Sequence, residues 1–182
     1  MTPARPLRAD DAPALARLVV ENRAFLAPWD PVRPESYYSL HGQRAVVDEL
    51  LAGARAGTGV PWVLLDDAGE VAGRITLSAV EHGYYRSARL GYWLAERLNG
   101  RGVATAAVRA ITDHAFDVLG LHRVEATTLP SNGRSQRVLE RAGFVRIGLA
   151  PRYLLIAGDW QDHVLFQLLA EDRPAAAPRP PG

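Results

Sequence analysis

The sequence predicts an α+β fold, in which helices flank a mixed but mostly antiparallel sheet. Strand-like segments follow one another between residues 60 and 94 with short turns between them, as in an antiparallel meander. A helical segment, 102–119, separates the last of these strands from the next one, 124–129, and such a crossover makes the two strands parallel neighbours. The chain then closes with a predicted hairpin over residues 144–169.

Two amphipathic helices are predicted before the meander. A short edge strand at 5–8 leads to Asp10-Asp11, which opens a helix of about three turns with apolar residues at helical spacing. Three prolines between residues 28 and 34 then force an extended or turning crossing. The second helix, 43–55, is ended by glycines at 57 and 59.

The later elements follow from their own patterns. Apolar alternation on either side of Asp66-Asp67-Ala68-Gly69 is typical of a hairpin, and apolar residues along one face indicate the long helix after Gly102. The predicted elements are strands 60–65, 71–80 and 84–94, helix 102–119, strand 124–129, helix 135–141, and strands 144–156 and 163–169.

Composition excludes several classes of protein. The formal net charge is only +1, which is too small for a protein that mainly binds nucleic acid. There is no cysteine, so disulfides, thiolate zinc sites and cysteine nucleophiles are excluded. All 21 basic residues are arginine. Schiff-base enzymes and Walker-type ATPases need a lysine, so both classes are excluded.

The 182 residues, 48% of them apolar, fit one globular domain, which we place at residues 1–172. Residues 173–182 are rich in proline and alanine and predict a disordered tail. No signal-peptide pattern and no run of about 18 apolar residues is present, so we expect a cytoplasmic protein without a membrane partner.

The strongest chemical signal is the glycine turn at residues 99–105, between a strand and a long helix. Small residues let backbone N–H groups converge there, and a helix N-terminus adds partial positive charge, so the turn predicts a pyrophosphate cradle. Arg97 or Arg101 could contact a further phosphate. A dinucleotide fold is disfavoured because Thr105 replaces the third glycine, while a purely structural turn stays open as an alternative.

The turn, Asn99-Gly100-Arg101-Gly102-Val103-Ala104, resembles the Gln/Arg-x-x-Gly-x-Gly/Ala signature of the GCN5-related N-acetyltransferase (GNAT) superfamily. Asn99 departs from the usual first residue. Residues 90–94, 130–135, 138–144, 21–36 and 153–165 are similar to the RimJ- and RimL-like branch, which acetylates the N-termini of ribosomal proteins. Many members of that branch carry an acid where this chain has Ala106.

The resemblance implies acetyl-CoA as the donor, with its pantetheine lying between strands 84–94 and 124–129, which are splayed apart as a parallel pair. Main-chain groups near Trp93 and Leu94 would pair with the pantetheine, and Asn132 would bind its amides. The candidate cofactor-binding residues are Trp93, Leu94, Arg97, Asn99, Gly100, Arg101, Gly102, Val103, Ala104, Thr105 and Asn132.

Relatives use a tyrosine on the helix after Asn132 as the general acid, but Leu139 takes that place here. Ser135 is therefore the candidate donor to the departing sulfur, with a helix-capping role as the alternative. Glu35 and Glu125 are the candidate bases, although an α-amine needs little help because its pKa is only about 7.7–8.0. The candidate acceptor-binding residues are Trp29, Asp30, Tyr37, Tyr92 and Tyr153.

The five histidines lack metal-ligand spacing, so no metal is expected. The first hypothesis for the acceptor is the α-amine of a protein that begins with alanine or serine, such as a ribosomal protein. A small-molecule amine or antibiotic is the alternative, because fold and donor site do not determine the acceptor. A third possibility is a catalytically silent module that binds acyl-CoA, and the sequence leaves monomer and homodimer both open.

Overall fold

The computed structural model describes residues 4–173, and the structural statements below refer to that part of the chain. Seven strands form one sheet in the order β1-β2-β3-β4-β5-β7-β6. The strands are β1 (Ala4–Pro6), β2 (Val60–Leu65), β3 (Val71–Glu81), β4 (Ser87–Leu94), β5 (Arg123–Thr128), β6 (Val145–Ile156) and β7 (Asp159–Leu169). Every neighbouring pair is antiparallel except β4 and β5, so the predicted α+β fold with one parallel pair is confirmed.

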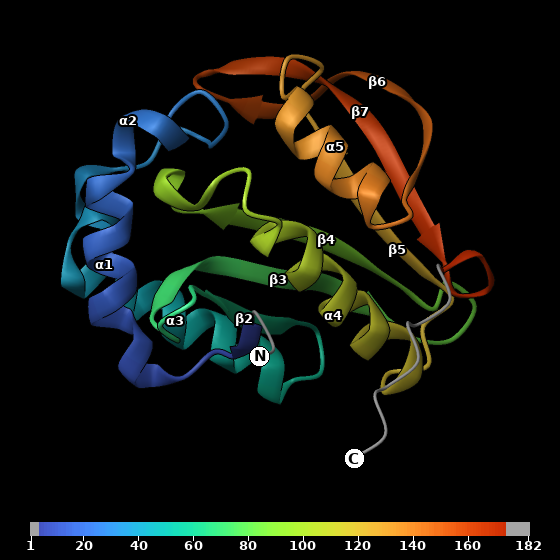
Figure 1. Ribbon diagram of the computed structural model, residues 1–182, viewed down its shortest axis with the longest axis horizontal. Helices are drawn as coiled ribbons and strands as arrows, with labels where there is room; N and C mark the ends of the chain where they lie inside the picture. The colour runs from blue at the N-terminus through green and yellow to red at the C-terminus, as the bar shows by residue number, and fades with distance from the viewer. Residues whose placement is uncertain (1–3, 174–182) are drawn as a thin grey trace.

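Helices cover both faces of the sheet (Figure 1). They are α1 (Ala12–Glu21), α2 (Arg23–Leu26), α3 (Leu40–Arg55), α4 (Val103–Asp117) and α5 (Gly133–Arg141). Short 3-10 turns lie at Ala9–Asp11, Glu35–Tyr38, Glu96–Leu98 and Ala170–Asp172.

Two apolar cores hold these layers together. On one face, Ile75 and Leu77 of β3 pack in the same buried cluster as Val108 and Ile111 of α4. On the other face, a smaller cluster joins α1 and α3 to the sheet through Leu7, Leu15, Val47 and Val63. The alternation along β3 therefore directs its intervening side chains, such as Arg74, away from the α4 core.

The first predicted helix is broken in two at Asn22. The Asn22 side chain is buried, donates from Nδ2 to the carbonyl of Leu18 and accepts at Oδ1 from the N–H of Glu96. An asparagine that bonds main-chain groups in this way competes with the helix, which explains the break. The bond to Glu96 also ties the end of α1 to the segment after β4.

Other boundaries differ from the prediction for local reasons. Helix α3 begins earlier, at Leu40, because the Ser39 side chain accepts from the N–H of Gly42 and caps it. Strand β4 begins later, at Ser87, after a turn that includes Gly83 and Arg86 at positive φ. Strand β7 begins four residues early because the hairpin turn is tight, with positive φ at both Ala157 and Gly158.

The parallel pair opens along its length. The register between β4 and β5 runs from Ser87 opposite Arg123 to Leu90 opposite Ala126 and goes no further. Beyond that point β4 stays paired with β3 as far as Leu94, and β5 stays paired with β7 as far as Thr128. The two strands therefore separate at their carboxyl ends, which is the splayed pair that the family resemblance implies.

Two sequence predictions concern regions beyond the core. The predicted tail lies outside the described residues except for Arg173, which forms ion pairs with Asp117 (2.6 Å) and Asp113 (4.0 Å) of α4. Residue 173 is thus fastened to the domain, one position past the predicted boundary. Among residues 4–173 no helix is long and apolar enough to span a bilayer.

Candidate functional site

The glycine turn between β4 and α4 exposes unpaired backbone donors. Gly100 and Gly102 both adopt left-handed backbone conformations, with φ of 78° and 80°, which residues with a side chain adopt only at a cost. Gly102 is the N-cap of α4, and no side chain caps this helix. The first-turn N–H groups of α4 therefore point into a space that an anion can fill.

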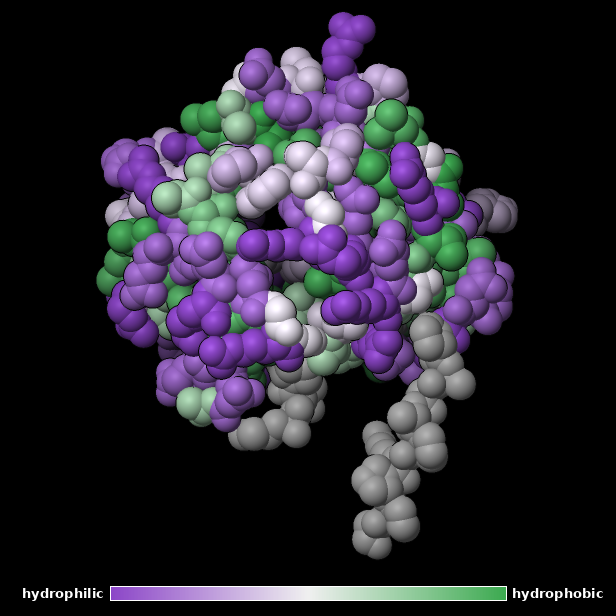
Figure 2. Space-filling model, turned by 45° about the horizontal axis from the view of Figure 1, so that its top comes forward, coloured by the Kyte–Doolittle hydropathy of each residue, from purple (hydrophilic) through white to green (hydrophobic). Residues whose placement is uncertain are grey.

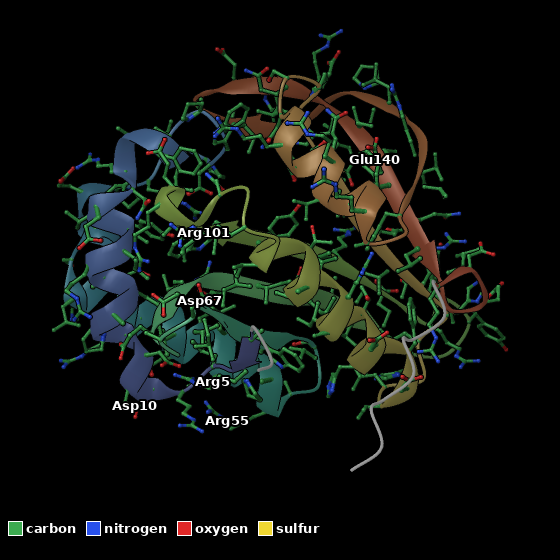
Figure 3. The ribbon with its side chains drawn as sticks, in the orientation of Figure 1. Arg5, Asp10, Arg55, Asp67, Arg101 and Glu140 are labelled. Carbon is green, nitrogen blue, oxygen red and sulfur yellow. The ribbon has the colours of Figure 1, made fainter. Side chains whose placement is uncertain are left out.

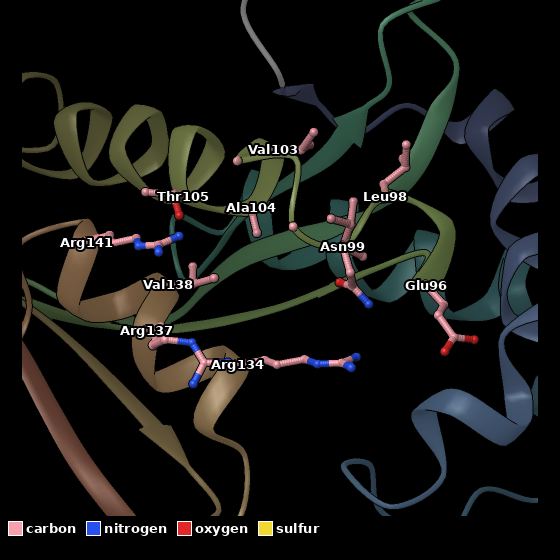
Figure 4. Close-up of a pocket in the computed structure, with 13 residues that line it drawn as sticks. Glu96, Leu98, Asn99, Val103, Ala104, Thr105, Arg134, Arg137, Val138 and Arg141 are labelled. Carbon is pink, nitrogen blue, oxygen red and sulfur yellow. The ribbon is translucent and has the colours of Figure 1, made fainter.

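A pocket of about 450 Å³ lies at this turn (Figure 4). Three arginines of α5, namely Arg134, Arg137 and Arg141, face the turn from across the pocket. Their spacing of three and four residues places them on one face of the helix. Arginine forks and helix N–H groups both bind phosphate, so the pocket suits a polyphosphate group.

Most of the predicted cofactor-binding residues line this pocket, whereas Trp93, Arg97, Arg101 and Asn132 do not. The predicted residues that line it are Leu94, Asn99, Gly100, Gly102, Val103, Ala104 and Thr105. Arg97 instead forms an ion pair with Asp66 at 3.3 Å, and Arg101, on the turn before α4 (Figure 3), lines neither this pocket nor the cleft described next. The arginines that face the phosphate space come from α5 and were not among the residues predicted from the sequence.

A larger cleft of about 1240 Å³ continues from this pocket. The two cavities share the lining residues Leu94, Glu96, Asn99, Ala104, Arg134 and Val138. The cleft runs past the splayed ends of β4 and β5 and is bordered by the α1–α2 segment and the tip of the β6–β7 hairpin. One face of the molecule is hollowed near its centre, with mainly hydrophilic residues around the hollow (Figure 2).

The proline-rich segment and the hairpin tip meet above the cleft. The N–H of Ala157 donates to the carbonyl of Asp30 over 3.1 Å, which joins the two walls. Trp29 and Tyr37, two of the residues predicted to bind the acceptor, line the cleft. Tyr153 does not line it and instead packs against the buried His163, with ring centroids 5.8 Å apart.

Ser135 and Tyr92 form a hydrogen-bonded pair at the splayed end of β4. Their hydroxyl oxygens are 2.8 Å apart, and both side chains line the cleft. Burial raises the pKa of Tyr92 to about 12, so its phenol keeps its proton throughout the neutral range. The N-cap of α5 is Asn132, whose Oδ1 accepts from the N–H of Ser135, so the alternative role of Ser135 as the capping residue is wrong. Trp93 and Asn132 also line this part of the cleft.

Arginines already neutralise the carboxylates proposed for the acceptor side. Asp30 accepts two hydrogen bonds from Arg33, at 3.0 and 3.2 Å. Glu35 accepts two from Arg23, both 2.8 Å, and these bonds lower its pKa. Asp30 lines the cleft, whereas Glu35 does not.

The second candidate base, Glu125, also lies outside the cleft. Its side chain is half-exposed and 3.6 Å from Arg123. Thr127, two residues further along the same face of β5, does line the cleft. The geometry therefore brings neither predicted base to the acceptor space.

Two buried polar atoms in the cleft lining have no hydrogen-bond partner within the described residues. They are Oγ1 of Thr76 and Nε1 of Trp93. Buried donors are normally satisfied, so such atoms indicate where a ligand or water completes the site. Over residues 4–173 no cluster of three histidine or acidic side chains is placed to hold a metal ion.

Comparisons with known proteins agree with this geometry. The acetyltransferase (GNAT) domain family matches residues 4–145. The probable N-acetyltransferase YjcK of Bacillus subtilis is 35% identical over 92% of this chain and 93% of its own length. The ribosomal protein uS5-alanine N-acetyltransferase of Escherichia coli is 36% identical over 89% of this chain and 84% of its own.

A solved structure is similar across the whole domain. Mycobacterium smegmatis RimJ in complex with CoA-disulfide superposes with a TM-score of 0.90 at 38% identity, and the match covers 95% of this chain and 84% of that one. The resemblance drawn from the glycine turn and the downstream motifs is therefore confirmed. The chain belongs to the GNAT acetyltransferase family.

Proposed function

We propose that this chain transfers an acetyl group from acetyl-CoA directly to the α-amine of a protein that begins with alanine or serine. The observation that carries the proposal is the end of the β4–β5 register at Leu90 and Ala126. It leaves main-chain groups of β4 without a strand partner in a cleft that is continuous with the phosphate-sized pocket. A donor with a diphosphate at one end and a thioester at the other matches this shape.

The residues present fit coenzyme A. The α4 N-terminus and the three α5 arginines offer donors to the diphosphate, and the free edge of β4 can pair with the pantetheine amides. The Oδ1 atom of Asn132 is used by the helix cap, so its amide N–H2 group remains to donate to a ligand. Bound here, acetyl-CoA supplies an activated acetyl group as its thioester.

Relatives support the acceptor class. The E. coli relative is a ribosomal protein uS5-alanine N-acetyltransferase, and the structural neighbour from M. smegmatis is RimJ in complex with CoA-disulfide. Ribosomal proteins are made in the cytoplasm, where we expect this enzyme to act.

The chemistry requires little acid or base. The neutral amine nitrogen attacks the thioester carbonyl carbon, the carbon–sulfur bond breaks, and the sulfur takes a proton. We assign the Ser135 hydroxyl as the donor of that proton; Tyr92, hydrogen-bonded to Ser135, replaces it and recovers its own proton from water. The amine proton leaves to water, because neither Glu35 nor Glu125 lines the cleft. Holding amine and thioester together supplies the larger share of the acceleration, on the order of 7–11 kcal/mol.

The test measures release of free CoA thiol with acetyl-CoA as donor. The acceptors are peptides that begin with alanine or serine, the same peptides with an acetylated N-terminus, and a panel of polyamines and aminoglycosides. We expect turnover with the free peptides and none with the blocked ones. Turnover only with the small amines would transfer the assignment to that class, and binding of acetyl-CoA without any turnover would leave a silent binding module.

A further inference from the structure

One arginine on the acceptor side of the cleft has no carboxylate partner. Arg74 lies in the middle of β3, and its side chain lines the cleft together with Thr76 and Ser78 on the same strand face. Within residues 4–173 none of the ion pairs includes Arg74. The guanidinium carries five N–H donors in a planar fork, which fits a carboxylate with two parallel bonds.

The surroundings of Arg74 leave its charge incompletely balanced. Burial lowers the pKa of its guanidinium, and the neighbouring Arg33 lowers it further, whereas Tyr37 and Asp30 favour the charged form. A charged group drawn out of water is costly unless an opposite charge or hydrogen bonds meet it. An anion that enters the cleft would therefore gain a partner whose hydration has already been removed.

The acids closest to this part of the chain are occupied. Arg33 holds Asp30 through two bonds, and Arg23 holds Glu35 in the same way. The charged residues in the cleft lining are Arg23, Arg33, Arg74, Arg134, Asp30 and Glu96. With Arg23 and Arg33 paired in this way, Arg74 and Arg134 still outnumber the remaining carboxylate, Glu96, so we expect an acceptor with a carboxylate to be favoured over a polycationic one.

Arg74 lies one strand away from the edge of β4 at which we place the reacting amine. In the β3–β4 register Arg74 lies opposite Trp93, on the strand next to the free edge of β4. Neighbouring strands are about 4.8 Å apart, and an extended peptide advances about 3.3–3.6 Å per residue. With the reacting amine placed at the free edge of β4, a carboxylate one or two residues beyond it comes within reach of the Arg74 side chain.

On the basis of the proposed function, we propose that Arg74 is a specificity residue that binds a carboxylate of the acceptor peptide at its second or third residue. The carboxylate can be an aspartate or glutamate side chain or the C-terminus of a very short peptide. Both present the same two oxygens to the guanidinium, and the experiment separates them.

The experiment compares C-terminally amidated ten-residue peptides that begin Ala-Glu, Ala-Gln and Ala-Lys and are otherwise identical. We expect kcat/KM to be about 10- to 100-fold higher for the glutamate peptide than for the glutamine peptide, and lowest for the lysine peptide. Arg74→Gln should lower kcat/KM for the glutamate peptide by that factor and change the glutamine peptide less than about threefold. Arg74→Lys should keep part of the preference, because it keeps the charge but loses the fork.

Controls isolate the contact. Arg89→Gln removes the same charge from an exposed position on β4 outside the cleft, so it should leave the whole peptide series unchanged. Calorimetric affinity for acetyl-CoA should be equal in wild type and Arg74→Gln, which reports an intact fold. Free Ala-Ala against Ala-Ala-amide tests the C-terminal carboxylate as the alternative source.

Each outcome decides something. Equal kcat/KM for the glutamate and glutamine peptides in the wild type would overturn the role of Arg74 and leave the proposed function standing. An equal loss on both peptides in Arg74→Gln would make Arg74 a merely structural residue. If the wild type acetylates no peptide at all, the proposed function fails and this inference fails with it.

Discussion

Replacing Arg137 by glutamine tests the phosphate pocket most directly. The Arg137 side chain is exposed and faces the glycine turn from α5, so its charge is partly screened by solvent. Hydrogen bonds to charged groups contribute about 1.5–3 kcal/mol, and for this exposed position we take about 1–2 kcal/mol. The expected loss of acetyl-CoA affinity is therefore about 5- to 30-fold, measured by titration calorimetry at fixed ionic strength.

Arg101→Gln is the matched control. It removes the same charge from an exposed arginine within the signature motif, but this side chain lines neither cavity. We expect less than about a twofold change in affinity. S-acetyl-pantetheine, which lacks the diphosphate and the nucleotide, supplies the second control, because its kcat/KM should be the same in the wild type and in Arg137→Gln.

Two results would refute the assignment of the pocket. One is an equal loss of acetyl-CoA affinity in Arg101→Gln and Arg137→Gln, which would show that the side chains of the turn also contact the phosphates. The other is a loss of activity in Arg137→Gln with S-acetyl-pantetheine, which would mean that the substitution disturbs the catalytic end of the cleft.

The other predictions concern the turn, the reacting groups and pH. Ser135→Ala should lower kcat about 10- to 100-fold with little change in KM. Tyr92→Phe should lower kcat less, because Tyr92 acts through Ser135. A rise in KM without a fall in kcat would show that Ser135 and Tyr92 serve only in binding. Glu35→Gln should leave kcat within about twofold, since this carboxylate already accepts two bonds from Arg23 outside the cleft, and a hundredfold loss would identify it as the base. Gly102→Ala should lower the free energy of unfolding in urea by about 1–2 kcal/mol, because a Cβ there meets no neighbouring atom within 4 Å and the cost is that of a φ of 80°; an unchanged midpoint would contradict this. The kcat of peptide acetylation should begin to rise at a lower pH than kcat/KM. Neither kcat nor kcat/KM should decrease as the pH is raised to about 11, because the pKa of Tyr92 is about 12.

The parts of the fold and site that were predictable depend on local signals. The glycine turn was predictable because two glycines, which can adopt positive φ, come directly before a long helix with an apolar face. Both glycines have positive φ in the structure. The parallel pair follows from a single helical crossover, and the end of its register at Leu90 is what the family resemblance implies.

The arginines of α5 were missed because their role depends on tertiary placement. Their spacing at 134, 137 and 141 is visible in the sequence and predicts one shared helix face. This face points toward the glycine turn only because α5 packs beside α4 in the folded protein. The pair of Ser135 and Tyr92 is likewise nonlocal, since its members are 43 positions apart in the sequence.

The same limit applies to the acids. Asp30 and Arg33 are three residues apart, so their pairing was open to prediction, whereas Glu35 meets Arg23 only because the chain reverses between these two residues, in the proline-rich crossing after α2.

The loss of those acids as bases changes how the acceptor amine becomes reactive. A nearby positive charge disfavours the protonated form of an amine, so a cleft in which arginines outnumber carboxylates lowers the pKa of the bound α-amine. The kcat/KM profile reports the pKa of the free peptide, about 7.7–8.0, whereas kcat reports the bound complex. The midpoint of kcat should therefore lie at the lower pH, and the enzyme needs no carboxylate to take the proton. Equal midpoints for the two profiles would show that the arginines do not act on the amine and that a base must be sought elsewhere in the cleft.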